Sequence, residues 1–409
     1  MRICITFVVL LALSVYAEER TPAQVSRDAK AAYDRKDYPV YLTEMRTLAA
    51  LRPENPVVVA NLGGAYALNG NTNDALVQLE RLAAMRVVAD LSDHDFDAVR
   101  DTPRFRAVLQ KIEETRTKPI HSATRSIAIP QKDLLSEAIV WDAKARTFLV
   151  SGNRKGKIVR VDLQGHVSDF VTEGIFGANG LGIDAKRNLL WASSSPSPRF
   201  EGYTEKNDAE MALVAIDLGT GKIVRRIAPP EDGEKHFLDD LTVAPDGAVY
   251  SSDSMGSVLR VNGDKLETLV PRGVLRSPQG SALGGGTLYV SDYATGVWAV
   301  DPKSGKASKL EPPSDCTTAG IDGLEYFDGS LLAIQNGVEP NRLVRLRLNG
   351  KRITKCEVLE MNHPQMDEPT VGVVVGKDFW FLAASQGNKF DENKTELLHE
   401  GLILGVPLQ

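Results

Sequence analysis

The sequence predicts a mainly β protein: a six-bladed β-propeller at residues 124–409, preceded by an α-helical domain at residues 18–118. Three observations support this fold class. After Pro119, short apolar strands alternate with Gly, Asp, Asn and Pro. Sets of four such strands recur about every 46 residues, which is typical of propeller blades. Residues 21–114 instead follow a helical period with few β-branched runs.

Composition excludes several classes of protein. Hydrophobic residues make up 43% of the chain and charged residues 25%, as in ordinary globular proteins rather than disordered ones. The 48 Lys and Arg residues against 54 Asp and Glu residues leave a net charge of -6, with no basic run. That balance argues against nucleic-acid binding through a basic surface. Beyond the first twenty residues, no apolar stretch is long enough to cross a bilayer.

The N-terminus has the pattern of an export signal. Arg2 precedes an almost unbroken apolar run from Ile3 to Leu13, and the small residue Ala17 stands before two acids. This pattern predicts a signal peptide at residues 1–17 that is cleaved after Ala17, and therefore a secreted or periplasmic protein. A membrane anchor is the alternative, but the apolar run is short for one and its exit is acidic.

Two cysteines, Cys316 and Cys356, remain after the predicted cleavage. In an oxidising compartment such a pair can form a disulfide. Nothing in the sequence gives the distance between them, so pairing is left open.

The helical domain contains an internal repeat. Residues 46–52 return 34 residues later as residues 80–86, and small residues stand where paired helices would cross. A period of 34 resembles the tetratricopeptide repeat, with residues 61–76 as the better copy. Only two repeats and a remnant are visible. We therefore expect a packing or docking module, one that offers a surface to a protein partner, rather than a long peptide-binding groove.

The β region contains six repeat units of unequal length. The longest carries an insertion, Ser195 to Met211, which is predicted to be a polar loop. The sixth unit reaches the C-terminus without an outer strand, whereas Thr124–Ile129 is an apolar strand ahead of the first unit. We expect this spare strand to complete the sixth blade and close the ring, which also removes an exposed sheet edge.

Every unit begins its first strand with an acid or an amide. Because the innermost strands of a propeller line the central channel, one position in the repeat becomes one ring of side chains. Carboxylates crowded there repel one another unless protons or a cation neutralise them. Oxygen donors without His or Cys favour a hard divalent cation, although a polar, water-filled channel without metal is the alternative. The six residues are Glu137, Asn179, Asp239, Gln279, Asp322 and Glu368.

Several local motifs resemble one known family. The segment 136–141, Ser-Glu-Ala-Ile-Val-Trp, occupies the position where that family has a Glu-Gly-Pro-x-Trp-like segment. Asp239-Asp240 occupies the position of the family's Asn-Asp pair. Gln279-Gly280 and Ile321-Asp322-Gly323 follow in the same blade order. From residue 137 to the end, the chain is similar to the senescence marker protein/gluconolactonase family, which includes regucalcin and bacterial lactonases.

The resemblance implies a site and an activity. It implies that Glu137, Gln279 and Asp322 hold a metal and that Asp322 is also the catalytic base. Asp239 would face the substrate, with Asn179 and Glu368 of the same ring as further substrate contacts. The implied cofactor is a divalent cation, Ca²⁺, Mg²⁺, Mn²⁺ or Zn²⁺, with Ca²⁺ favoured. The implied function is metal-dependent hydrolysis of a lactone or a similar sugar-like ligand.

Two departures from the family motif leave a second function open. Gln279 replaces an expected Asn and is one methylene longer, and Asp239 replaces an expected amide and adds a negative charge. The alternative is a non-catalytic exported propeller that binds a peptide, a glycan or a protein partner. Serine-hydrolase chemistry is disfavoured, because the chain contains no Gly-x-Ser-x-Gly motif.

Overall fold

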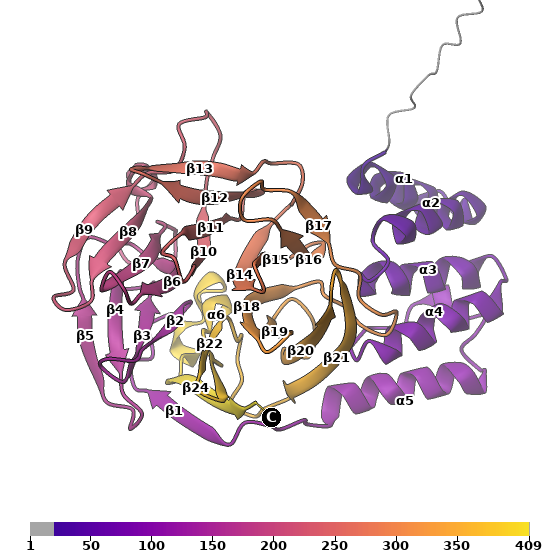
Figure 1. Ribbon diagram of the computed structural model, residues 1–409. Helices are drawn as coiled ribbons and strands as arrows, with labels where there is room; N and C mark the ends of the chain where they lie inside the picture. Colours follow the sequence, from indigo (N-terminus) through magenta and orange to yellow (C-terminus); the bar gives the residue numbers. More distant parts are fainter. Residues whose placement is uncertain (1–19, 409) are drawn as a thin grey trace, which may run out of the picture.

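A computed structural model describes residues 20–408, and they form a six-bladed β-propeller with a helical region packed against one side (Figure 1). The predicted fold class is therefore confirmed. The predicted signal peptide at residues 1–17 lies outside the described residues. Within the described part, no helix is long and apolar enough to span a membrane.

The helical region contains two antiparallel helix pairs and a final helix. Each begins at a residue suited to cap it: the Asn55 side chain, for example, accepts a hydrogen bond from the Val58 backbone N–H at 3.1 Å. The predicted small residues do lie at a helix contact, since a Cβ on Gly63 would be 3.0 Å from the Leu79 side chain. The elements are α1 (Pro22–Asp34), α2 (Tyr38–Leu51), α3 (Pro56–Leu68), α4 (Thr72–Ala84), the 3₁₀ turn η1 (His94–Phe96) and α5 (Pro103–Thr117).

Each blade is a four-stranded antiparallel sheet whose first strand is innermost. Blades 1 and 2 contain β2 (Ile139–Asp142), β3 (Thr147–Gly152), β4 (Lys157–Val161), β5 (Val167–Val171), β6 (Ala178–Asp184), β7 (Leu189–Ser194), β8 (Ala212–Asp217) and β9 (Ile223–Ile227). Blades 3 and 4 contain β10 (Leu238–Val243), β11 (Val249–Asp253), β12 (Ser257–Asn262), β13 (Lys265–Val270), β14 (Pro278–Gly284), β15 (Thr287–Asp292), β16 (Gly296–Val300) and β17 (Ala307–Lys309). Blades 5 and 6 contain β18 (Ile321–Phe327), β19 (Ser330–Gln335), β20 (Arg342–Asn349), β21 (Arg352–Met361), β22 (Gly372–Val375), β23 (Asp378–Leu382), β24 (Gly401–Pro407) and, at the outer edge, β1 (Arg125–Ile129).

The ring closes through β1, as predicted. This strand pairs antiparallel with β24, with Ile127 opposite Ile403 and Ile129 opposite Gly401. Ile127 and Ile129 are buried in a core cluster that also contains side chains of blade 1. The first strand of the propeller thus holds the last blade against the first.

The helical region contacts the propeller mainly at blade 5, and Figure 1 shows its helices beside β21. The backbone N–H of Val88 donates to the Glu339 carbonyl at 2.7 Å. The buried guanidinium of Arg342 donates through Nη1 to the carbonyls of Met85 at 3.0 Å and Arg86 at 2.6 Å. Val338 packs against the apolar core of the helices. The segment between β19 and β20, together with the first residue of β20, therefore links the two regions.

Cys316 and Cys356 form a disulfide, with their Cα atoms 6.1 Å apart. Cys316 lies in the connection that leads into β18, and Cys356 lies on β21. The bond ties this connection to the outer strand of blade 5, which answers the question that the sequence left open.

Candidate functional site

One end of the central channel opens into a cavity of about 460 Å³. Each blade contributes one of the predicted polar residues to its wall, so side chains far apart in the sequence share one enclosed space. The structure thereby brings together Glu137, Asn179, Asp239, Gln279, Asp322 and Glu368.

In four blades the polar residue lies in an irregularity of the innermost strand. The pairing of these strands with their neighbours shifts register across Asn179, Asp239, Gln279 and Asp322. Such a bulge turns a side chain away from the regular pleat. The prediction that every one of the six is the first residue of its strand is wrong in detail. The four residues in these irregularities are each the second residue of their strand, and Glu137 and Glu368 lie ahead of β2 and β22 in the connecting segments.

Glycines next to the polar residues let the innermost strands approach closely. A Cβ on Gly180 would lie 2.6 Å from the Leu241 backbone nitrogen, and one on Gly280 would lie closer still to the Asp322 carbonyl oxygen of the next blade. In blade 3 the corresponding position is Asp240, and its Oδ2 instead accepts a hydrogen bond from the Ser281 N–H at 2.8 Å. Close approach of the strands keeps the channel narrow at the level of the site.

The proposed metal ligands are only partly used by hydrogen bonds within the protein. Asn336 Nδ2 donates to Asp322 Oδ2 at 2.6 Å, and Ser385 Oγ donates to Glu137 Oε1 at 3.1 Å. Among the described residues, no hydrogen bond uses Glu137 Oε2, Asp322 Oδ1 or Gln279 Oε1. Each therefore keeps lone pairs available for a ligand in the cavity.

Burial in this cavity disfavours the charged form of its acids. It raises the pKa of Glu137 to about 8, with Asp322 and Glu368 adding repulsion although Arg199 opposes the shift. Burial also raises the pKa of Asp322 to about 7, opposed by the Asn336 hydrogen bond. For Asp239, burial and then the charge of Asp322 hold the pKa well above its usual range. A bound cation would relieve all of these interactions.

Arg199 is a residue of the site that sequence reasoning missed. It lies in the insertion between β7 and β8, which was predicted as a polar loop and contains the 3₁₀ helix η2 (Glu205–Glu210). Its Nη1 donates to Glu137 Oε1 at 3.3 Å, while Nε and Nη2 donate to the two carboxylate oxygens of Asp391 at 2.9 and 2.6 Å. Asp391 ends the short helix α6 (Gly387–Asp391), which Figure 1 shows near the centre of the ring of blades. Nothing in the spacing of the insertion indicated this contact.

The donor set fits a hard divalent cation. Two carboxylates and an amide oxygen come from three different blades, and the wall of the cavity contains no His or Cys within the described chain. Glu137 and Asp322 belong to no described group of three or more His, Cys, Asp or Glu whose ligand atoms all lie within 4.8 Å of one another. A cation held there by Glu137, Gln279 and Asp322 would keep part of its water shell.

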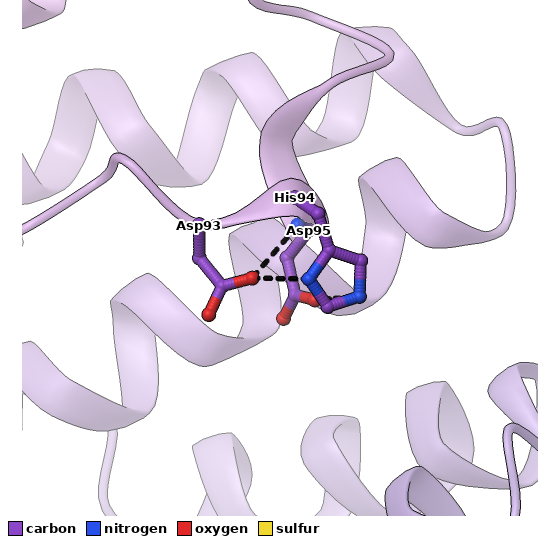
Figure 2. Close-up of side chains that lie close together, drawn as sticks. All are labelled: Asp93, His94 and Asp95. Atoms are coloured by element: carbon purple, nitrogen blue, oxygen red, sulfur yellow. Dashed lines mark hydrogen bonds and ion pairs between the residues drawn. The ribbon is translucent and has the colours of Figure 1, made fainter.

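A tighter cluster of potential ligands lies in the helical region instead. Asp93, His94 and Asp95 are the only described group of three or more His, Cys, Asp or Glu whose ligand atoms all lie within 4.8 Å of one another (Figure 2). His94 Nδ1 lies 2.5 Å from Asp93 Oδ1, and Tyr33 donates to Asp95 Oδ1 at 2.8 Å. The cluster is largely exposed and its acids already have partners, so we assign it no metal.

No family model and no curated protein sequence match the chain. Solved structures that share its fold include a gluconolactonase from Xanthomonas campestris, 16% identical, covering 71% of this chain and 95% of that one, with a TM-score of 0.51. A calcium-binding protein, regucalcin, from Agrobacterium tumefaciens is 14% identical and covers 69% of this chain and 95% of that one, with a TM-score of 0.50. A luciferin-regenerating enzyme is 13% identical, with coverages of 69% and 96% and a TM-score of 0.50. The predicted resemblance to gluconolactonase and regucalcin propellers is therefore confirmed for the fold.

Proposed function

We propose that this chain is an exported hydrolase that opens a cyclic ester, such as a sugar lactone, with the help of a divalent cation. One observation carries the proposal: Glu137, Gln279 and Asp322 line one cavity at the end of the channel, and each keeps an oxygen that no hydrogen bond within the described chain uses. The gluconolactonase among the proteins of the same fold makes lactones the first substrates to test.

Glu137, Gln279 and Asp322 would hold the cation, which when bound would polarise the ester carbonyl and lower the pKa of a nearby water. Asp322 is the candidate general base, because it lines the cavity and its Oδ1 takes part in no hydrogen bond within the described chain. It would take a proton from the water as the water oxygen bonds to the ester carbon. When the ring C–O bond breaks, the same proton would pass to the leaving oxygen and give a hydroxy acid.

Asn336 serves this mechanism by holding the base in place. Its amide donates to Asp322 Oδ2, which leaves Oδ1 for the proton transfer. Asn336 is itself held, since Tyr293 Oη donates to its Oδ1 at 3.0 Å and its Nδ2 also reaches the Pro369 carbonyl at 3.1 Å. Fixed orientation of a base raises the fraction of encounters that react.

Substrate contacts are assigned to the rest of the ring. Asn179 Oδ1 accepts from Asn153 Nδ2 at 2.6 Å, so its orientation is set, and Glu368 Oε2 accepts from the Asn388 N–H at 2.8 Å. Together with Asp239, these side chains would offer acceptors to the hydroxyl groups of a sugar-like ring. This part of the proposal rests on their position in the cavity wall.

Export and a protein partner complete the proposal. The disulfide between Cys316 and Cys356 is typical of exported proteins and agrees with the signal sequence predicted at residues 1–17. The helical region would dock a protein partner, and several large apolar side chains on it are exposed, among them Val57 on α3 at 67% and Val77 on α4 at 45%.

The test combines elemental analysis of the purified protein with a panel of lactones assayed with and without a chelator. We expect one divalent ion per chain, hydrolysis that stops on chelation and returns with Ca²⁺ or Mn²⁺, and no hydrolysis by Asp322→Asn. A wild-type protein that binds no divalent ion at millimolar concentration, or an Asp322→Asn variant as active as wild type, would refute the catalytic proposal. A non-catalytic binding propeller would then be the better account.

A further inference from the structure

We propose that the cavity selects lactones that carry a positively charged group, an ammonium being the simplest, and that Asp239 recognises this charge. The inference rests on the proposed lactone hydrolysis and names its substrate class. It starts from the charges in the cavity wall and from the one acid there that has no partner.

The wall of the cavity is strongly acidic. Six carboxyl groups line it against a single base, Arg199, which gives a formal charge of -5 when all six are ionised. One divalent cation would reduce this charge to -3. A cavity with such a charge repels anionic ligands and concentrates cationic ones. The six acids are Glu137, Asp239, Asp240, Asp322, Glu368 and Asp391.

Five of the six acids already accept hydrogen bonds from the protein. Their donors belong to different elements: Arg199 and Ser385 for Glu137, Ser281 for Asp240, Asn336 for Asp322, Asn388 for Glu368, and Arg199 for Asp391. Asp239 differs from all of them. Across residues 20–408, no donor reaches its carboxylate, although its backbone carbonyl is held by the hydroxyl of Ser193.

Within the described residues the protein offers the Asp239 side chain neither a donor nor a cation, and partial burial disfavours the ionised form of an acid in that position. An ammonium group on the ligand would supply both the missing charge and the missing donor, and hydrogen bonds between two charged groups are the stronger class. A neutral hydroxyl would supply only a donor. The difference between these two ligands should therefore appear as selectivity, and Asp239 should determine it.

The backbone at Asp239 is held in place within the strand. It lies in the bulge of β10, and its backbone carbonyl contacts Ser193 of the preceding blade. The backbone that carries this side chain is therefore tied to the neighbouring blade. The next residue, Asp240, has the same chemistry but a satisfied carboxylate, and it provides a matched control.

The experiment compares 2-amino-2-deoxy-glucono-δ-lactone with glucono-δ-lactone at a pH where the amine is charged. We expect wild type to favour the amino lactone about tenfold or more in kcat/KM, which corresponds to about 1.4 kcal/mol. Asp239→Asn should remove most of this preference, whereas Asp240→Asn should keep it. Equal loss in both variants would mean that the general charge of the cavity, not Asp239, is responsible, and would overturn the inference.

Binding measurements separate this inference from the proposed function. The non-hydrolysable δ-lactams of the same two sugars are titrated into each variant by NMR, with cation affinity measured in parallel. If no lactone is hydrolysed but wild type binds the amino lactam more tightly and Asp239→Asn does not, hydrolysis fails and the recognition of charge stands. If wild type hydrolyses or binds both ligands equally, charge recognition is wrong. If Asp239→Asn loses cation affinity by about tenfold or more, Asp239 is a metal ligand and the inference is also wrong.

Discussion

Replacing Asn336 by Ala tests the arrangement around the proposed base without removing the base. The variant loses the hydrogen bond from Asn336 Nδ2 to Asp322 Oδ2, which is 2.6 Å long. Hydrogen bonds to charged groups contribute about 1.5–3 kcal/mol. Only the part of this contribution that is specific to the charged, cation-binding form of Asp322 changes the affinity, so the loss predicts a cation affinity lower by up to roughly 150-fold, since about 1.4 kcal/mol corresponds to a factor of ten. Mutating the hydrogen-bond partner of a metal ligand typically lowers metal affinity 10- to 100-fold, which agrees with this expectation.

The assay is calorimetric titration of Ca²⁺ and Mn²⁺ into the purified protein, together with the pH dependence of kcat/KM. Because the Asn336 hydrogen bond lowers the pKa of Asp322, its loss should raise that pKa and move the acid limb of the profile to higher pH.

Asn362→Ala is the control, because the Asn362 amide also donates two hydrogen bonds, in its case to the carbonyls of Thr115 and Lys118, outside the cavity wall. This variant should lose stability but keep cation affinity. Unchanged cation affinity in Asn336→Ala would refute the reasoning.

Three further predictions concern stability. Burial raises the pKa of Glu325 to about 8, so the folded chain retains a proton that the unfolded chain releases above its ordinary pKa of 4.5. The free energy of unfolding, measured in urea, should therefore fall as pH rises from 4.5 towards 8. Glu325→Gln should lose less stability over this range, by an amount on the order of 1–2 kcal/mol. An equal loss in the variant and in wild type would contradict the prediction. Cys356→Ser opens a loop of 40 residues and should cost about 4 kcal/mol in the chain-entropy model, measured by denaturant unfolding against the oxidised protein; a variant as stable as wild type would mean that the bond contributes little. Ile129→Ala in the closing strand should cost about 2–5 kcal/mol by leaving a cavity, whereas a cost under about 1 kcal/mol would show that β1 does not hold the ring.

The ring of six polar residues could be predicted because the blade repeat carries the information. Once the period identifies the first strand of each unit, one position in six units must face the same channel, whatever the lengths of the loops. The repeat also predicted the closing role of Thr124–Ile129, since one unit lacked a strand. Such inferences depend on counting strands and not on side-chain detail.

The remaining residues of the site lie in loops, whose sequences do not follow the repeat of the blades. Arg199 reaches the cavity from the β7–β8 insertion and is held there by Asp391, 192 positions further along the chain. Asn336 lies just after β19 and resembles any polar residue at the end of a strand. Their roles follow from contacts between loops of different blades, which one sequence does not reveal.

The β19–β20 segment has a thermodynamic consequence for the whole molecule. One end of it, Asn336, bonds to Asp322 in the cavity, and the other, Glu339, accepts the Val88 N–H of the helical region three residues later. If cation binding at Asp322 restrains this segment, linkage requires that the docked helical region favour the cation by the same free energy. Hydrogen exchange at the Val88 amide would then slow when the cavity is filled, although the ion lies in a different domain. The helical region, which is attached at the rim of the propeller, would in that case respond to cation binding at the centre of the ring.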